Sequence, residues 1–135
     1  MLSSIDSYKV AYANPRLAPY GKAALEVMEA LSLFESLERN LVQGENISQV
    51  YQFVFTGNAE LGFIAQSQIP HNSELVLGST WVIPAALHSP IKQDVVLLSR
   101  AKDNVAAREF MSFLSSPRSQ AVIRSYGYES GVSAR

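Results

Sequence analysis

The sequence contains no cysteine, which excludes disulfide bonds and thiolate metal sites. No apolar run approaches the ~20 residues that span a bilayer. The first six residues lack the basic region followed by an apolar region that marks an export signal. On these absences alone, a native gene product would be cytoplasmic, whereas an excerpt would leave its compartment undetermined.

The sequence also lacks an excess of charge of either sign. Its formal net charge is −1, from 11 Lys and Arg against 12 Asp and Glu, and the basic residues do not cluster. We therefore expect no nucleic-acid partner. With 135 residues, 47% hydrophobic and 17% charged, the composition is that of one globular domain that can bury a core.

Catalytic and metal-binding motifs are absent as well. There is no glycine-rich phosphate loop, no GxGxxG, no HExxH and no GxSxG. His71 and His88 each stand in a loop-like stretch with no carboxylate at ligand spacing. We expect no enzyme activity, no cofactor and no metal cation site.

The most informative stretch runs from Gln43 to Ala65 and predicts a turn, a capped helix and a strand. Asn46 is a favourable N-cap, and Gln49 follows three residues later as in a capping box. Ile47 and the residues three, four and seven positions later are apolar, which predicts one buried helix face. Gly57-Asn58 is a helix stop, and residues 61–65 predict a strand covered on both faces.

An earlier stretch repeats this organisation. Residues 8–13 predict a strand, and two prolines make residues 14–19 irregular. A helix is predicted to begin near Tyr20 or Gly21, with a buried stripe formed by Ala24, Val27, Met28 and Leu31.

The remaining elements complete an α/β pattern. A short helix is predicted over 32–39, a strand at 41–43, a loop over 66–72, strands at 75–77 and 80–83, one helical turn at 84–87, and a β-rich stretch at 93–98. A helix capped by Asp103 or Asn104 carries Ala106, Phe110, Phe113 and Leu114, and Pro117 opens a further helix that Gly127 ends. The aromatic residues Trp81, Phe53, Phe55 and Phe63 are expected in the core. This alternation predicts a largely parallel sheet.

Two predicted helices begin at the carboxyl ends of strands, where open α/β sheets place ligands. Their first N–H groups and positive dipole ends favour an anion, and a fully ionised oxyanion offers acceptors only. Glu45 lies next to one helix start and would repel an anion unless its side chain turned outward.

Several motifs in order resemble the molybdate-binding proteins of bacterial ABC transporters. They are Ala13-Asn14-Pro15, residues 18–24, residues 44–47, residues 52–54, residues 56–63 and Tyr126-Gly127-Tyr128, so that the resemblance runs from about Tyr8 to Tyr128. That family has two α/β lobes joined by a hinge, which close over molybdate or tungstate.

The resemblance implies an oxyanion site made by the backbone N–H groups of Tyr20 and Ile47. Gly21, Asn46 and Ala65 are secondary candidates. Some relatives place a tyrosine hydroxyl at the position of Ala65 and a small residue at that of Tyr20. Because this pair is reversed here, the Tyr20 hydroxyl is expected to make that contact, and Ala65 can supply no side-chain bond.

The resemblance also divides the chain into parts. Residues 1–86 would form the second lobe, 87–128 the hinge strand and helices that return to the first lobe, and 129–135 a flexible tail. Nothing matches the first lobe itself, whose hydroxyl side chains grip the other side of the oxyanion. The chain would then be a shortened gene product, an excerpt or a proteolytic remnant.

The implied setting is periplasmic, with the membrane permease of a transporter as partner. A homodimer through the C-terminal helices would cover an apolar face that the absent lobe leaves open. Two other classes stay open on the sequence: the effector-sensing domain of a transcription regulator, which would need a helix-turn-helix not found here, and a small enzyme.

Overall fold

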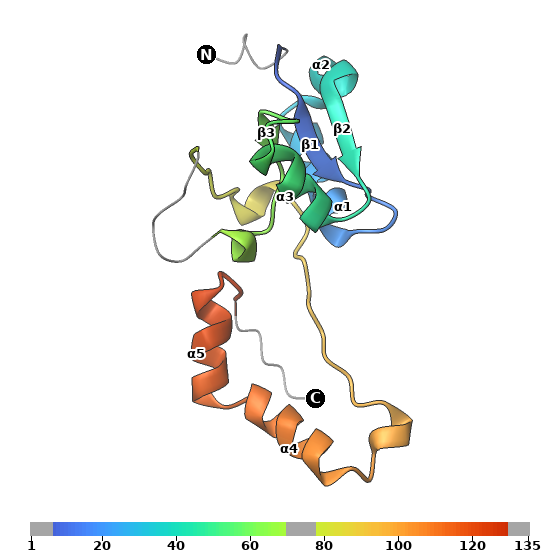
Figure 1. The fold of residues 1–135 in the computed structure, drawn as a ribbon, viewed down its shortest axis with the longest axis vertical. Helices are drawn as coiled ribbons and strands as arrows, with labels where there is room; N and C mark the ends of the chain where they lie inside the picture. The colour runs from blue at the N-terminus through green and yellow to red at the C-terminus, as the bar shows by residue number, and fades with distance from the viewer. Residues whose placement is uncertain (1–6, 70–77, 130–135) are drawn as a thin grey trace. The chain divides into compact units, whose positions relative to one another are not determined.

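A computed structural model describes residues 7–69 and 78–129 of the chain (Figure 1). These residues fall into two compact units. The first contains residues 7–69 and 78–91, and the second contains residues 92–129.

The first unit is built on a three-stranded parallel sheet. Its central strand β1 (Val10–Ala13) pairs with β2 (Leu41–Gly44) on one side and with β3 (Leu61–Gly62) on the other, in the order β2-β1-β3 (Figure 1). Ala13 stands opposite Gly44, and Val10 stands opposite Leu61. The predicted α/β class with a parallel sheet is confirmed.

Helices α1 (Pro19–Ala30) and α3 (Ile47–Phe55) connect the strands and cover the sheet. Successive strand residues point to opposite faces, and the core accordingly forms two clusters. Ala11 and Ala13 pack with Val50 of α3, whereas Val10 packs with Met28 of α1 and with Leu37 of α2 (Phe34–Leu37). Each face of the sheet is therefore closed by its own helical cover.

The predicted helix over 32–39 is split into α2 and a 3-10 turn, η2 (Glu38–Asn40). The expected burial of Leu31 is wrong, because α1 ends at Ala30 and the side chain of Leu31 is 40% exposed. Ser32 adopts a left-handed conformation, with φ 55°, and turns the chain toward α2.

The strand predicted over 61–65 is shorter and more exposed than expected. Only Leu61–Gly62 forms β3, and Leu61 is 40% exposed. Among the described residues β3 pairs with β1 alone and lies at the edge of the sheet. A short 3-10 turn, η3 (Gln66–Gln68), follows within the expected loop. The helical turn predicted at 84–87 is present as η4 (Ala85–Leu87).

Two other predicted β segments are not strands. Residues 80–83 and 93–98 pair with no strand among the described residues, and a segment without a paired neighbour gains no ladder hydrogen bonds. Trp81 and Phe55 are more than half exposed, so their expected core positions are wrong. The strand predicted at 75–77 lies outside the described residues.

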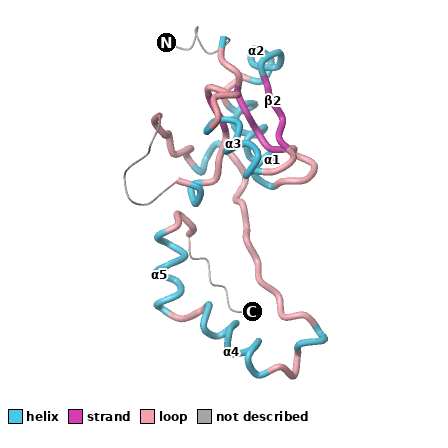
Figure 2. The backbone as a smooth tube through the Cα atoms, in the orientation of Figure 1, coloured by secondary structure: helices cyan, strands magenta, loops and turns pink. Residues whose placement is uncertain are grey.

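The described part of the second unit contains helices and loops but no strand (Figure 2). A 3-10 turn, η5 (Ser99–Ala101), precedes α4 (Val105–Leu114), and α5 (Pro117–Ser125) follows. The predicted cap of α4 is Asn104, whose side-chain oxygen accepts from the Ala107 N–H at 3.1 Å. Gly127, with φ 82°, ends α5 as predicted.

The helices of the second unit leave large apolar side chains in contact with solvent. Phe110 is 57% exposed, Phe113 is 49% exposed, and Val122 is 53% exposed. In the described part of this unit only Ser119 is buried. Residues 92–129 therefore bury no apolar core of their own. Across the parts of the chain that the structure describes, no helix has the length and apolar character to cross a membrane.

Candidate functional site

The candidate site lies at the carboxyl edge of the sheet. Because β1 and β2 are parallel with Ala13 opposite Gly44, the chain leaves both strands at the same edge. The Asn14 N–H donates to the Gly44 carbonyl at 2.7 Å and holds the two exits together. Helices α1 and α3 follow these exits, so both helix starts belong to this end of the sheet (Figure 1).

The start of α1 is set by a close helix–strand approach at Gly21. A Cβ on Gly21 would lie 2.1 Å from the Ala13 carbonyl oxygen, closer than real Cβ atoms come. Only glycine fits there, as in other turns where a helix begins directly against a strand end. Pro19 occupies the first helical turn, where a missing N–H costs no hydrogen bond. Tyr20, which is half-buried, lies between Pro19 and Gly21 at this helix start.

The start of α3 is capped by side chains. The Asn46 side-chain oxygen accepts from the Gln49 N–H at 3.0 Å, which confirms the predicted cap. Gln49 reaches back one residue further than in the usual capping box, and its Oε1 accepts from the Glu45 N–H at 2.7 Å. No described group accepts a hydrogen bond from the Ile47 N–H. This helix start therefore presents an N–H donor, while Glu45 is exposed.

Ala65 is brought to α3 by a residue that the sequence did not single out. The Gln68 Oε1 accepts from the Ala65 N–H at 2.9 Å, and the Gln68 Nε2 donates to the Ile47 carbonyl at 3.3 Å. Gln68 was missed because it lies in a stretch expected to be a loop, where no spacing rule marks a residue. The structure thus joins Ala65 to Ile47 through one side chain.

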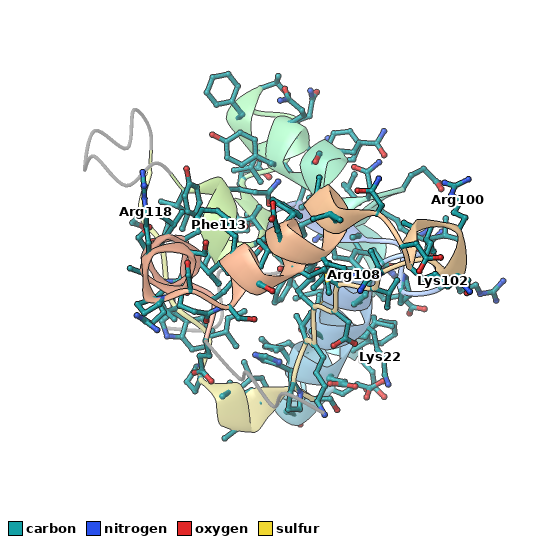
Figure 3. All side chains as sticks on the ribbon, turned by 90° about the horizontal axis from the view of Figure 1, so that it is seen from below. Lys22, Arg100, Lys102, Arg108, Phe113 and Arg118 are labelled. Atoms are coloured by element: carbon teal, nitrogen blue, oxygen red, sulfur yellow. The ribbon has the colours of Figure 1, made fainter. Side chains whose placement is uncertain are left out.

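The charges near the start of α1 are largely engaged with each other. Lys22 lies on the flank of α1 (Figure 3) and forms an ion pair with Glu26 at 3.7 Å. The Glu26 carboxylate also accepts from the Ser89 N–H at 2.6 Å. This backbone hydrogen bond, with smaller effects of the Ser89 hydroxyl and Lys22, holds the pKa of Glu26 below its usual value despite the opposing effect of burial. The described residues include no group of His, Asp and Glu that would hold a metal ion.

Known proteins resemble this chain along nearly its whole length. The family of bacterial extracellular solute-binding proteins matches residues 3–129. The molybdate-binding protein ModA of Azotobacter vinelandii is 47% identical over 119 residues, which cover 88% of this chain and 47% of that protein. ModA of Rhodobacter capsulatus is 47% identical over 123 residues, which cover 91% of this chain and 48% of that protein.

Solved structures agree with this match. The periplasmic molybdate-binding protein of A. vinelandii superimposes with a TM-score of 0.83 at 31% identity, and covers 92% of this chain and 55% of that one. A substrate-binding domain described as part of a molybdenum ABC transporter of Clostridium difficile gives a TM-score of 0.71 at 27% identity, with 96% and 57% covered. The chain spans about half the length of the relatives that it matches.

The parallel sheet with helix starts at its carboxyl edge defines an α/β lobe of the kind that binds ligands at that edge. The chain belongs to the family of bacterial extracellular solute-binding proteins. This family consists of solute-binding proteins and not of enzymes, and the match favours it over a transcription regulator.

Proposed function

We propose that this chain belongs to the solute-binding component of a molybdate or tungstate ABC transporter and contributes one lobe of its oxyanion site. The backbone N–H groups of Tyr20 and Ile47 would hold the oxyanion, with Gly21, Asn46 and Ala65 beside them. The observation that carries this proposal is the pair of helix starts at one edge of the sheet, in a chain 47% identical to molybdate-binding proteins.

The chemistry of these helix starts suits a tetrahedral dianion. The first N–H groups of a helix point along the axis without intrahelical acceptors, and the dipole adds positive potential at that end. An ionised oxyanion has acceptors only, so N–H groups select it over ligands that must donate. No resident cofactor or metal cation is part of the proposal, because molybdate is the cargo itself.

The proposed organisation follows the likeness to two-lobed relatives. Residues 1–86 form the second lobe, 87–128 the hinge strand and helices that return to the first lobe, and 129–135 a tail. The partners would be the first lobe of such a protein and the membrane permease of the transporter, in the periplasm. In the absence of a first lobe, the exposed faces of α4 and α5 would pair in a homodimer.

The 135-residue chain alone should bind the oxyanion weakly, because the site is shared between two lobes. Hydrogen bonds to a charged group contribute ~1.5–3 kcal/mol each. The loss of three or four of them would remove ~5–12 kcal/mol, and each 1.4 kcal/mol is tenfold in Kd.

Isothermal titration calorimetry with molybdate, tungstate and sulfate tests this proposal. The expected result is weak or undetectable heat with the chain alone, and tight, selective binding of molybdate or tungstate once a first lobe is supplied. Tight selective binding by the monomer would contradict the shared site. No binding by the reassembled two-lobe protein would refute the oxyanion function.

A further inference from the structure

The amide of Gln68 makes two hydrogen bonds of opposite sense at the candidate site. Its Oε1 accepts from the Ala65 N–H at 2.9 Å, and its Nε2 donates to the Ile47 carbonyl at 3.3 Å. A backbone N–H can only donate and a backbone carbonyl can only accept, so these partners fix the orientation of the amide. A carboxylate in its place could satisfy only Ala65, and an ammonium only Ile47.

These two bonds join separate parts of the chain. Ala65 directly precedes the η3 turn and is 4% exposed. Ile47 is the first residue of α3, and its N–H is a proposed oxyanion donor. The η3 turn is closed by its own bond, from the Gln68 N–H to the Ala65 carbonyl at 2.9 Å. The side chain of Gln68 then fastens this closed turn to the first turn of α3.

We infer that Gln68 is a positioning residue of the oxyanion site, which holds the Ala65 segment against the start of α3. This inference rests on the proposed function. It also changes the role of Ala65, because the Ala65 N–H is engaged by Gln68 and is not offered to a ligand. Ala65 then contributes to the shape of the site, and Gln68 fixes the distance between Ala65 and the Ile47 N–H.

The test compares Gln68→Met with Gln66→Met in the full chain. Methionine keeps the length of the side chain and removes both hydrogen bonds. Gln66 is the matched control, because it lies on the same η3 turn, is exposed, and its side chain makes no hydrogen bond to the described residues. Amide hydrogen exchange at Ala65 and NMR titration of the Ile47 amide with molybdate are measured for both variants.

We expect Gln68→Met to accelerate exchange of the Ala65 N–H about tenfold and to weaken molybdate binding about threefold or more. Gln66→Met should match the wild type in both measurements. If the Ala65 N–H of Gln68→Met exchanged as slowly as in the wild type, the Gln68 side chain would not hold this N–H. If exchange were faster but the affinity for molybdate unchanged, Gln68 would have no positioning role. If the Ile47 amide of the wild-type chain did not shift at concentrations that saturate weak sites, the proposed oxyanion contact at Ile47 would be refuted, and with it the positioning role of Gln68. The Ala65 exchange rates would still show, independently of molybdate binding, whether the Gln68 side chain holds the Ala65 N–H.

A second pair of variants keeps the inference testable if Gln68→Met does not fold. Gln68→Glu retains the acceptor for Ala65 and loses the donor to Ile47, and Gln66→Glu adds the same charge to the same turn. We expect Ala65 exchange to stay slow in both glutamate variants, and molybdate affinity to fall further in Gln68→Glu than in Gln66→Glu. Equal losses of affinity would show that charge alone acts, and would overturn the inference.

Discussion

Replacement of Gly21 by alanine tests whether the close approach of α1 to β1 shapes the site. The new Cβ would meet the Ala13 carbonyl oxygen at 2.1 Å, whereas real Cβ atoms essentially never come closer than 3.0 Å. The helix start or the strand end must therefore move by about 0.9 Å, the difference between these distances. The atoms in the way are backbone atoms, which cannot rotate aside as a side chain can.

The magnitude follows from two opposing effects. Alanine is favoured over glycine inside a helix by ~1 kcal/mol. Overpacking of a filled site costs ~1–3 kcal/mol and occasionally more. Because the clash here is with backbone, we expect an overpacking cost of about 3 kcal/mol, at the upper end of that range. After the gain of ~1 kcal/mol from alanine, the net destabilisation is about 2 kcal/mol.

Urea unfolding followed by circular dichroism measures this change, and Gly57→Ala is the control. Gly57 has φ +73°, and a Cβ added there would meet nothing within 4 Å, so alanine costs only the left-handed conformation, ~1–2 kcal/mol. Both variants should lose stability, but only Gly21→Ala should shift the Tyr20 amide resonance. A Gly21→Ala chain as stable as the wild type would refute the close-packing argument.

Three further predictions follow from individual contacts. Asn46→Ala removes the cap of α3 and should lower the unfolding free energy by ~1 kcal/mol in the same urea assay. An unchanged unfolding free energy would show that Gln49 alone holds the helix start. Glu26→Gln should make the unfolding free energy fall less steeply as the pH is lowered. A lowered carboxyl pKa stabilises the fold at pH values above the unfolded pKa near 4.5, and this stability is lost as the pH falls through the folded pKa. The same loss of unfolding free energy at low pH in both proteins would contradict the Ser89 contact. Phe110→Ser should weaken self-association seen by light scattering at high concentration, because each large apolar side chain that a dimer covers contributes ~1.5–3 kcal/mol, and a strictly monomeric wild type would exclude the dimer.

Local sequence rules predicted the elements of the first unit well. The cap at Asn46, the helix stop at Gly57 and the two strand–loop–helix connections were predicted because each depends on residues close together in sequence. The parallel sheet followed from their alternation. The placement of both helix starts at the carboxyl edge of the sheet could be expected on the same grounds.

The failures occurred where structure depends on distant neighbours. Apolar segments at 80–83 and 93–98 have strand-like composition, yet a strand also needs a partner edge, which sequence does not reveal. Trp81 was expected in the core for its side chain alone, although burial depends on what covers it. The Gln68 bridge was missed for a similar reason, since it joins residues 21 apart in sequence.

The most direct test of the oxyanion site is an NMR titration of the isotopically labelled chain with molybdate, which detects weak binding residue by residue. We predict that the amide resonances of Tyr20 and Ile47 shift first and furthest, and that the amide of Leu31, at the opposite end of α1, stays in place. Shifts confined to other parts of the chain, or no shifts at concentrations that saturate weak sites, would contradict the oxyanion site at these two helix starts.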